Sequence, residues 1–185
     1  MSGIRFFENN FNFKSIKFTD VNTRKDAIFI VFIRDPIIRW LSGAAQYFHP
    51  YENIVPPDYK IDPMMLDLIF SAVCLDAHTR TQWDYLEGFN LKRCYFFDTD
   101  DVEFENRIKK FTKQFMGVDT LKDEFVKSNL ITESPFKMNI RKQLKDAMES
   151  NPVYKENLLR YHKNDIEQIN YIKTRHMYGK KFIVG

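Results

Sequence analysis

The sequence has no run of about 20 apolar residues, the length that a helix needs to cross the hydrocarbon core of a bilayer. Its N-terminus lacks the apolar segment of a secretory signal peptide. Cysteine is scarce, and two residues, Cys74 and Cys94, are too few for a disulfide framework, so reduced thiols are the default. These absences predict a soluble, cytoplasmic protein without a membrane span.

Glycine and proline are also scarce, with 6 and 7 residues among 185, which argues against a low-complexity or loop-rich chain. The formal net charge is only +3, whereas a nucleic-acid-binding surface needs a denser basic stripe, so no nucleic-acid partner is expected. Hydrophobic residues make up 44% of the chain, at a length that suits one domain with a real core. We therefore expect a single globular domain over residues 1–185 and leave its oligomeric state open.

No pattern of metal ligands occurs in the sequence. It contains neither a Cys-x-x-Cys nor a His-x-x-x-His pair. The acidic stretch 98–101 (DTDD) resembles half of a calcium loop but lacks the glycine and the closing glutamate at the required spacing. An acidic turn before a helix is the simpler interpretation, because the helix dipole favours aspartate there. No metal is expected.

Apolar runs that predict strands alternate with segments that predict helices. The run 27–33 predicts a strand buried on both faces as in a parallel sheet, and 92–101 predicts another buried strand that leaves into an acidic turn. Five further segments predict helices: 36–48, 63–73, 102–117, 134–150 and 151–176. Apolar residues mark one face of the first of these helices (Ile37, Ile38, Leu41, Ala44, Ala45 and Phe48) and one face of the third (Phe104, Ile108, Phe111 and Phe115). This order predicts a helix-rich α/β domain with a short, incomplete parallel sheet.

Residues 32–48 (FIRDPIIRWLSGAAQYF) join the first strand to the first helix, with Asp35 placed to cap that helix. Open α/β sheets bind anionic ligands where a strand leads into a helix, because free backbone N–H groups and the helix dipole point there. Arg34 adds a planar set of donors, and Arg39 and Ser42 share one side of the helix. These residues form a candidate phosphate clamp. The alternative is that Arg34 pairs with a nearby carboxylate, Asp35 merely caps the helix, and Ser42 faces solvent.

Residues 34–42, with the pattern Arg-Asp-Pro-x-x-Arg-x-x-Ser, resemble the 3′-phosphate motif of carbohydrate-type sulfotransferases. That family often has an aromatic residue two positions after the serine, where this chain has Ala44. The resemblance implies a P-loop-like sulfotransferase fold in which Arg34, Arg39 and Ser42 bind the 3′-phosphate of the donor, 3′-phosphoadenosine 5′-phosphosulfate. It also implies transfer of a sulfonate, without a metal, to a hydroxyl of an acceptor such as a glycan.

Three later segments resemble the family more weakly but occur in its order, so the similarity extends over roughly residues 25–175. In residues 76–86, His78 and Gln82 occupy the positions of the family's His-x-x-x-Gln segment. Residues 94–117 resemble the family's strand, acidic turn and following helix, with Asp98 where the family usually has Glu. Residues 158–172 resemble its closing helix, with Tyr161 and Asp165 in place. The first block, residues 34–42, is the specific one.

Sulfonate transfer needs a base that takes the proton of the acceptor hydroxyl and cations that face the sulfonate. His78 is the candidate catalytic base, because imidazole accepts protons near neutral pH; a structural, hydrogen-bonded histidine is the alternative. Arg80 is a candidate to face the sulfonate or an anionic acceptor. The other histidines are expected on the surface: His49, His162 and His176.

The chain departs from the family in one respect. Sulfotransferases carry a glycine-rich phosphosulfate loop of the type Pro-Lys-x-Gly-Thr-Thr, whose backbone amides hold the 5′-phosphate, and no segment here matches it. One interpretation is a non-catalytic binding or assembly protein that kept a degenerate form of the fold. The other is a rearrangement in which the C-terminal run 180–184 (KKFIV) takes the strand position that precedes the missing loop.

Overall fold

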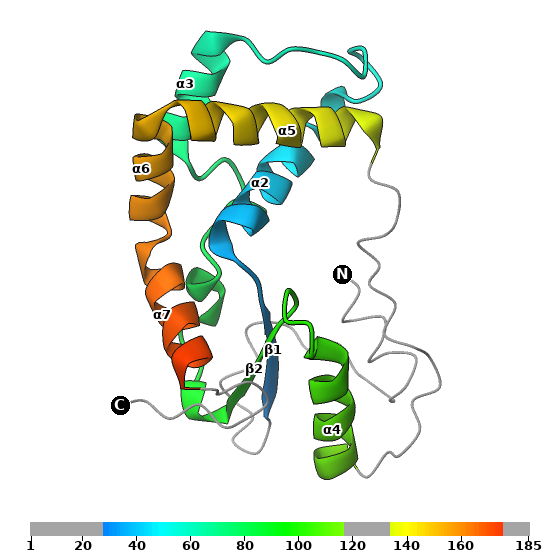
Figure 1. Ribbon diagram of the computed structural model, residues 1–185, viewed down its shortest axis with the longest axis vertical. Coiled ribbons are helices and arrows are strands. Elements are labelled where there is room, and N and C mark those ends of the chain that lie inside the picture. The colour runs from blue at the N-terminus through cyan, green and yellow to red at the C-terminus, as the bar shows by residue number, and fades with distance from the viewer. Residues whose placement is uncertain (1–27, 117–133, 176–185) are drawn as a thin grey trace. The chain divides into compact units, whose positions relative to one another are not determined.

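The computed structural model describes residues 28–116 and 134–175, which are the coloured parts of the ribbon in Figure 1. These residues form two compact units. The first contains residues 28–34, 86–116 and 169–175, and the second contains residues 35–85 and 134–168. Two sequence predictions lie outside the described residues: the strand over 180–184 and the exposure of His176.

A two-stranded parallel sheet lies in the first unit. Strand β1, Phe29–Ile33, pairs with β2, Cys94–Asp98, in a register that places Ile33 opposite Asp98 (Figure 1). The short parallel sheet in a helix-rich α/β chain is therefore confirmed. The prediction that β1 is buried on both faces is wrong: β2 is buried along its whole length, whereas Ile33 is the one fully buried residue of β1. The burial of β2 confirms the prediction of a second buried strand, and helix α4 packs against it.

Helix α4, Phe104–Met116, follows β2 after a short turn. Its apolar residues recur every three or four positions, and three of them are buried as the sequence predicts: Phe104, Ile108 and Phe111. They form one hydrophobic cluster with Tyr95 and Phe97 of β2, whose ring centroids lie 4.9 and 5.4 Å from that of Phe111. The cluster fixes both ends of the turn that joins the strand to the helix.

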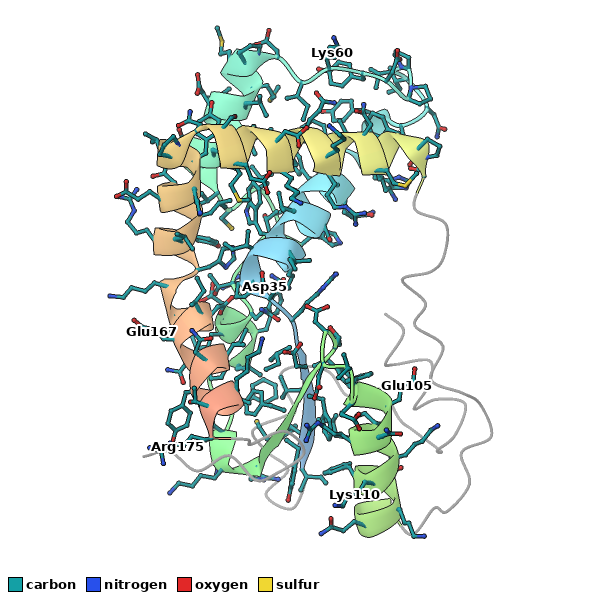
Figure 2. All side chains as sticks on the ribbon, viewed as in Figure 1. Asp35, Lys60, Glu105, Lys110, Glu167 and Arg175 are labelled. Atoms are coloured by element: carbon teal, nitrogen blue, oxygen red, sulfur yellow. The ribbon has the colours of Figure 1, made fainter. Side chains whose placement is uncertain are left out.

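The second unit is built from helices. Helix α2, Pro36–Tyr47, begins where the sequence predicts, with Asp35 at its start (Figure 2). The Asp35 carboxylate accepts hydrogen bonds of 2.9 Å from the backbone N–H groups of Ile37 and Ile38. These bonds satisfy two donors that a helix N-terminus otherwise leaves free, a contribution of about 1 kcal/mol to stability.

The buried face of α2 differs in part from the sequence prediction. Ile38, predicted to face the core, is 46% exposed, whereas Trp40 is fully buried and donates a 2.5 Å hydrogen bond from Nε1 to the carbonyl of Val73. Residues 38 and 40 are separated by about 200° around a helix, so burial of the tryptophan turns the isoleucine outward. Of the other predicted core residues, Leu41, Ala44, Ala45 and Phe48 are buried, and Ile37 is partly buried and packs against the same core.

Three more helices complete the second unit: α3 (Pro63–Ala72), α5 (Pro135–Ser150) and α6 (Pro152–Tyr161). Each begins with a proline that follows a capping side chain, in turn Asp62, Ser134 and Asn151. Helix α5 crosses α2 and also packs against α6, which in turn packs against α3 (Figure 1). Together with α2 these helices enclose one hydrophobic core.

The sequence predicts one helix over 151–176, and this prediction is wrong. The chain forms two helices, α6 and α7 (Lys163–Thr174), with a break at His162. The backbone of His162, at φ −93° and ψ 12°, leaves the α-helical region. In the part of the chain that the structure describes, no helix is both long and apolar enough to cross a membrane.

The two thiols lie in different surroundings, which predicts different reactivity. Cys74 is exposed, whereas Cys94 begins the buried strand β2, and burial raises the pKa of its thiol to about 11. Because the thiolate is the reactive form, we expect one fast equivalent per chain with a disulfide reagent at pH 8, and a second equivalent in denaturant. The variant Cys74→Ser should lose the fast equivalent. Two fast equivalents in the native protein would contradict the buried position of Cys94.

Candidate functional site

Arg34 lies at the carboxyl end of β1, within the first unit and beside the end of β2. Its Nε is 3.2 Å from Oδ1 of Asp100, and the two side chains are 31% and 37% exposed. The guanidinium therefore has the carboxylate partner that one of the two sequence interpretations predicts. Because the pair is open to solvent, it contributes at most about 1 kcal/mol and can be exchanged for another anion.

Asp100 belongs to the acidic turn, residues 98–101, in which three carboxylates have cationic partners from three different elements. In addition to the Arg34 pair, Asp98 lies 3.1 Å from the Nζ of Lys173, and Asp101 lies 2.7 Å from the Nε of Arg107. The predicted acidic turn before a helix is confirmed. Among the residues that the structure describes, no group of three or more His, Cys, Asp or Glu side chains is arranged to hold a metal ion.

Backbone hydrogen bonds hold the acidic turn against the end of β1. The N–H of Thr99 donates to the carbonyl of Ile33 at 2.9 Å, so the pairing of the two strands continues one residue into the turn. The N–H of Asp100 donates to Oδ1 of Asp98, also at 2.9 Å. Since Arg34 directly follows Ile33, these bonds place Asp100 within reach of the guanidinium.

In the second unit, Arg39 on α2 and His78 lie on two segments that pack together. Nη1 of Arg39 donates to the backbone carbonyl of Arg80. Nearby on the same helix, Gly43 packs on the backbone of His78, and a Cβ at position 43 would lie 2.7 Å from the carbonyl carbon of His78. Glycine at this position therefore allows α2 to approach the segment 76–86 closely.

Ser42 precedes Gly43 on α2 and is half-buried. Its Oγ donates to the carbonyl of Ile38 at 3.1 Å, the bond that serines in helices make with the preceding turn. The hydroxyl is thus hydrogen-bonded within the helix and does not simply face solvent. To bind an anion it has to rotate away from this carbonyl, which keeps its own helical hydrogen bond.

Tyr85 lies beside two guanidinium groups, an arrangement that the sequence analysis did not single out. The Cζ atoms of Arg39 and Arg80 are 5.8 and 5.9 Å from the centroid of its ring, within the range of cation–π attraction. The Tyr85 hydroxyl donates to the carbonyl of Ala77, and Nε of Arg80 is 3.4 Å from a carboxylate oxygen of Asp84. Two cations from separate segments are therefore held near one aromatic ring.

His78 has a carboxylate partner two residues before it. Its Nδ1 lies 2.9 Å from Oδ2 of Asp76, and its side chain is 58% exposed. Burial acts to raise the pKa of Asp76, but hydrogen bonds from the ring and the backbone N–H of His78 outweigh it and hold that pKa below its ordinary value. A carboxylate at Nδ1 favours the tautomer that carries its proton on Nδ1 and leaves Nε2 as an acceptor, which suits a general base and equally a structural histidine.

A buried carboxylate anchors the segment that carries His78. Asp165 is fully buried and accepts hydrogen bonds from the backbone N–H groups of Gln82 and Trp83, at 2.7 and 2.8 Å. Nδ1 of His162 lies 3.4 Å from the same carboxylate. Gln82 and Asp165, two of the residues behind the weaker family resemblance, are thus joined through the backbone of Gln82.

The prediction that His162 is a surface residue is wrong. Its side chain is fully buried, and Nε2 has no hydrogen-bond partner among the described residues. The charged residues around His162 in the sequence suggested exposure. The spacing, however, indicates burial, because His162 is four positions after buried Leu158 and three before buried Asp165, which places the three residues on one helix face. His49 is exposed as predicted, with Nδ1 2.7 Å from Glu52.

Tyr161 ends α6 beside this buried pair. Its ring lies edge-to-face with that of His162, at a centroid distance of 4.8 Å. Burial, followed by a hydrogen bond with Cys74, raises the pKa of the Tyr161 hydroxyl. Tyr161 is therefore neutral and packs as part of the support beneath the segment 76–86.

No family model matches the chain, and no curated protein or solved structure matches it. Arg34 belongs to the first unit, and the other three candidate residues belong to the second: Arg39, Ser42 and His78.

Proposed function

We propose that this chain is a sulfotransferase-like enzyme that transfers a sulfonate from 3′-phosphoadenosine 5′-phosphosulfate to a hydroxyl of a carbohydrate-like acceptor. The observation that carries the proposal is the place of the motif 34–42. It begins at the carboxyl end of a parallel strand and runs into a helix, the kind of place at which α/β proteins bind phosphate groups. Because the Asp35 carboxylate accepts from the N–H groups of Ile37 and Ile38, the proposed contacts to the phosphate come from side chains of the motif. The fold that we propose is the P-loop-like sulfotransferase fold, with β1 and β2 as part of its sheet.

Arg34, Arg39 and Ser42 are the proposed ligands of the 3′-phosphate. Arg34 would exchange the carboxylate of Asp100 for the phosphate, and because this ion pair is exposed to solvent the exchange costs little. Ser42 would rotate its hydroxyl from the carbonyl of Ile38 toward the ligand. A guanidinium presents several donors in one plane, which suits the oxygens of a phosphate group.

His78 is the proposed catalytic base. Its Nε2 would take the proton of the acceptor hydroxyl while Asp76 holds Nδ1 and stabilises the imidazolium that forms. The acceptor oxygen bonds to sulfur, the bond between sulfur and the bridging oxygen breaks, and adenosine 3′,5′-bisphosphate leaves with the bonding electrons. Arg80 is proposed to face the sulfonate and to balance its charge.

Calorimetric titration with adenosine 3′,5′-bisphosphate tests this proposal. We expect the wild type to bind with a Kd of about 1 μM or weaker, and Arg34→Ala to lose about 1.5–3 kcal/mol of binding free energy, the worth of a charge-assisted hydrogen bond. Arg107→Ala is the matched control, because it removes a guanidinium paired with Asp101 of the same acidic turn and should bind as the wild type does. Equal affinities for wild type and Arg34→Ala would contradict the site.

A second candidate function is binding without catalysis, as in a protein that kept the nucleotide site and lost the reaction. The sequence feature that favours it is the lack of a glycine-rich segment to hold the 5′-phosphate. Incubation with radiolabelled 3′-phosphoadenosine 5′-phosphosulfate and a mixture of glycans distinguishes the two. Label transfer that disappears in His78→Ala supports the enzyme, whereas nucleotide binding without transfer supports the second function.

A further inference from the structure

We infer that Thr79 is a positioning residue, whose buried hydroxyl fixes the turn 75–79 so that the Asp76 carboxylate holds His78 in the tautomer with an accepting Nε2. The inference rests on the proposed function and adds to it a residue that supports the catalytic base without touching the substrate. Thr79 lies outside the motif 34–42 and directly follows His78 in the second unit.

The hydroxyl of Thr79 is fully used within the turn. Thr79 is completely buried, and its Oγ1 accepts from the backbone N–H groups of Leu75 and Asp76 at 2.8 and 3.0 Å. The same hydroxyl donates to the backbone carbonyl of Asp76 at 3.0 Å, with Oδ1 of Asp76 a more distant alternative at 3.4 Å. A hydroxyl has one proton to donate and two lone pairs to accept with, so these bonds exhaust it. One buried side chain therefore holds the backbone of Asp76 at both its N–H and its carbonyl.

The carboxylate of Asp76 bonds to His78 through both of its oxygens. Oδ1 accepts from the backbone N–H of His78 at 2.8 Å and from that of Thr79 at 3.2 Å. Oδ2 lies 2.9 Å from Nδ1 of the His78 ring. Because one carboxylate holds both the backbone and the ring of His78, the position of Asp76 determines that of the imidazole.

Spacing along the chain brings Asp76 and His78 within reach of each other but does not by itself hold them together. Their side chains are 30% and 58% exposed, and a pair this open to water gains little from its own attraction. Nδ1 keeps the proton only while an acceptor stays beside it, so a carboxylate that is free to rotate would leave His78 in both tautomers. The hydroxyl of Thr79 is buried, where water competes less for its bonds, and it fixes the turn before a substrate arrives.

Three substitutions of buried threonines test the inference. Thr79→Val keeps the shape of the side chain but puts a methyl group where the hydroxyl lies 2.8 and 3.0 Å from two backbone nitrogens, which is closer than a carbon atom packs, so the turn has to open. Thr79→Ser keeps the hydroxyl. Thr81→Val is the matched control, because the hydroxyl of Thr81 serves a different part of the segment: its Oγ1 accepts from the N–H of Asp84 at 3.3 Å.

Nitrogen NMR at alkaline pH, where imidazole is neutral, measures the tautomer of His78. We expect the Nδ1–H tautomer in the wild type, in Thr79→Ser and in Thr81→Val, and a mixture of both tautomers in Thr79→Val. Burial acts to raise the pKa of the Asp76 carboxyl, and hydrogen bonds from the ring and the N–H of His78 hold that pKa below its ordinary value, so it should rise in Thr79→Val alone. The kcat of sulfonate transfer should fall roughly 10- to 100-fold in that variant, the effect of a displaced catalytic group, and serine should restore it.

A measurement on the wild type takes the place of Thr79→Val if that variant does not fold. The N–H groups of Leu75 and Asp76 should exchange their hydrogens more slowly than the N–H of exposed Ala77, because a buried hydroxyl accepts their bonds. Rapid exchange at both positions would overturn the inference.

The outcomes separate the inference from the function on which it rests. An unchanged tautomer in folded Thr79→Val, or equal changes in Thr79→Val and Thr81→Val, overturns the inference, while sulfonate transfer by the wild type still supports the function. If the NMR results are as expected but the wild type transfers no sulfonate, the proposed function fails and the positioning of His78 by Thr79 stands.

Discussion

Replacing Asp165 with alanine is expected to lower the free energy of unfolding by about 3–5 kcal/mol. The substitution leaves the backbone N–H groups of Gln82 and Trp83 without their acceptor, and each donor that loses its partner in the interior costs about 1–3 kcal/mol. It also removes the carboxylate beside the buried ring of His162. Urea denaturation, followed by the fluorescence of Trp40 and Trp83 and by far-ultraviolet circular dichroism, measures the loss.

Glu167→Ala is the matched control for this prediction. It removes the same charge from the same helix, but the Glu167 side chain is 60% exposed on the outside of α7 and 3.9 Å from Lys163 (Figure 2). An exposed pair of this kind changes stability by roughly 0.5 kcal/mol or less. Asp165→Asn, which keeps one acceptor oxygen, should fall between the two. Similar losses for Asp165→Ala and Glu167→Ala would show that Asp165 does not anchor the segment 76–86.

Gly43→Ala is expected to destabilise the protein by about 3 kcal/mol, the upper end of the range for an overpacked site. Alanine is the better helix former by up to about 1 kcal/mol, so helix propensity alone predicts that Gly43→Ala stabilises the protein. The added Cβ, however, would lie 2.7 Å from the carbonyl carbon of His78, and that neighbour is backbone, which cannot rotate out of the way. Either α2 or the segment around His78 has to move.

The position of His78 supplies a second measurement for Gly43→Ala. We expect the NMR signals of the His78 ring to shift, because the segment that carries it is displaced from α2. Ser42→Ala, one position earlier, removes a hydroxyl bonded within the helix and should leave both the stability and the His78 signals nearly unchanged. A Gly43→Ala variant as stable as the wild type would show that the backbone of His78 leaves room for a Cβ at position 43.

The sequence predicts most element starts because their signals are local. An aspartate followed by a proline marks the beginning of both α2 and α3, and the cap bonds of Asp35 and Asp62 confirm the reason. The break between α6 and α7 could not be predicted in this way. It coincides with Asp165 bonding to backbone groups of the distant segment 76–86, and no pattern within the helix reports such a partner.

The candidate site shows the same division between local and distant causes. The sequence places Arg34 at the exit of a strand, and Asp76 lies close enough to His78 along the chain for their pairing to follow from spacing. The partner of Arg34 comes from the turn after β2, which carries several carboxylates. The register of the two strands determines which of these carboxylates lies beside Arg34. The pairing of Arg34 with Asp100 therefore depends on how the two strands pair in the folded sheet, which the sequence near Arg34 does not specify.

The parallel pairing of β1 with β2 has a consequence for synthesis on the ribosome. β1 leaves the exit tunnel long before β2, and most of the residues made in between, 35–85, belong to the second unit. The core of the second unit also needs α5 and α6, which are synthesised later, and the partner of Asp98, Lys173, lies near the end of α7. Neither unit can close cotranslationally from its early segments alone, so the nascent chain exposes apolar strand and helix faces for most of its elongation, which is the condition under which chaperones are recruited.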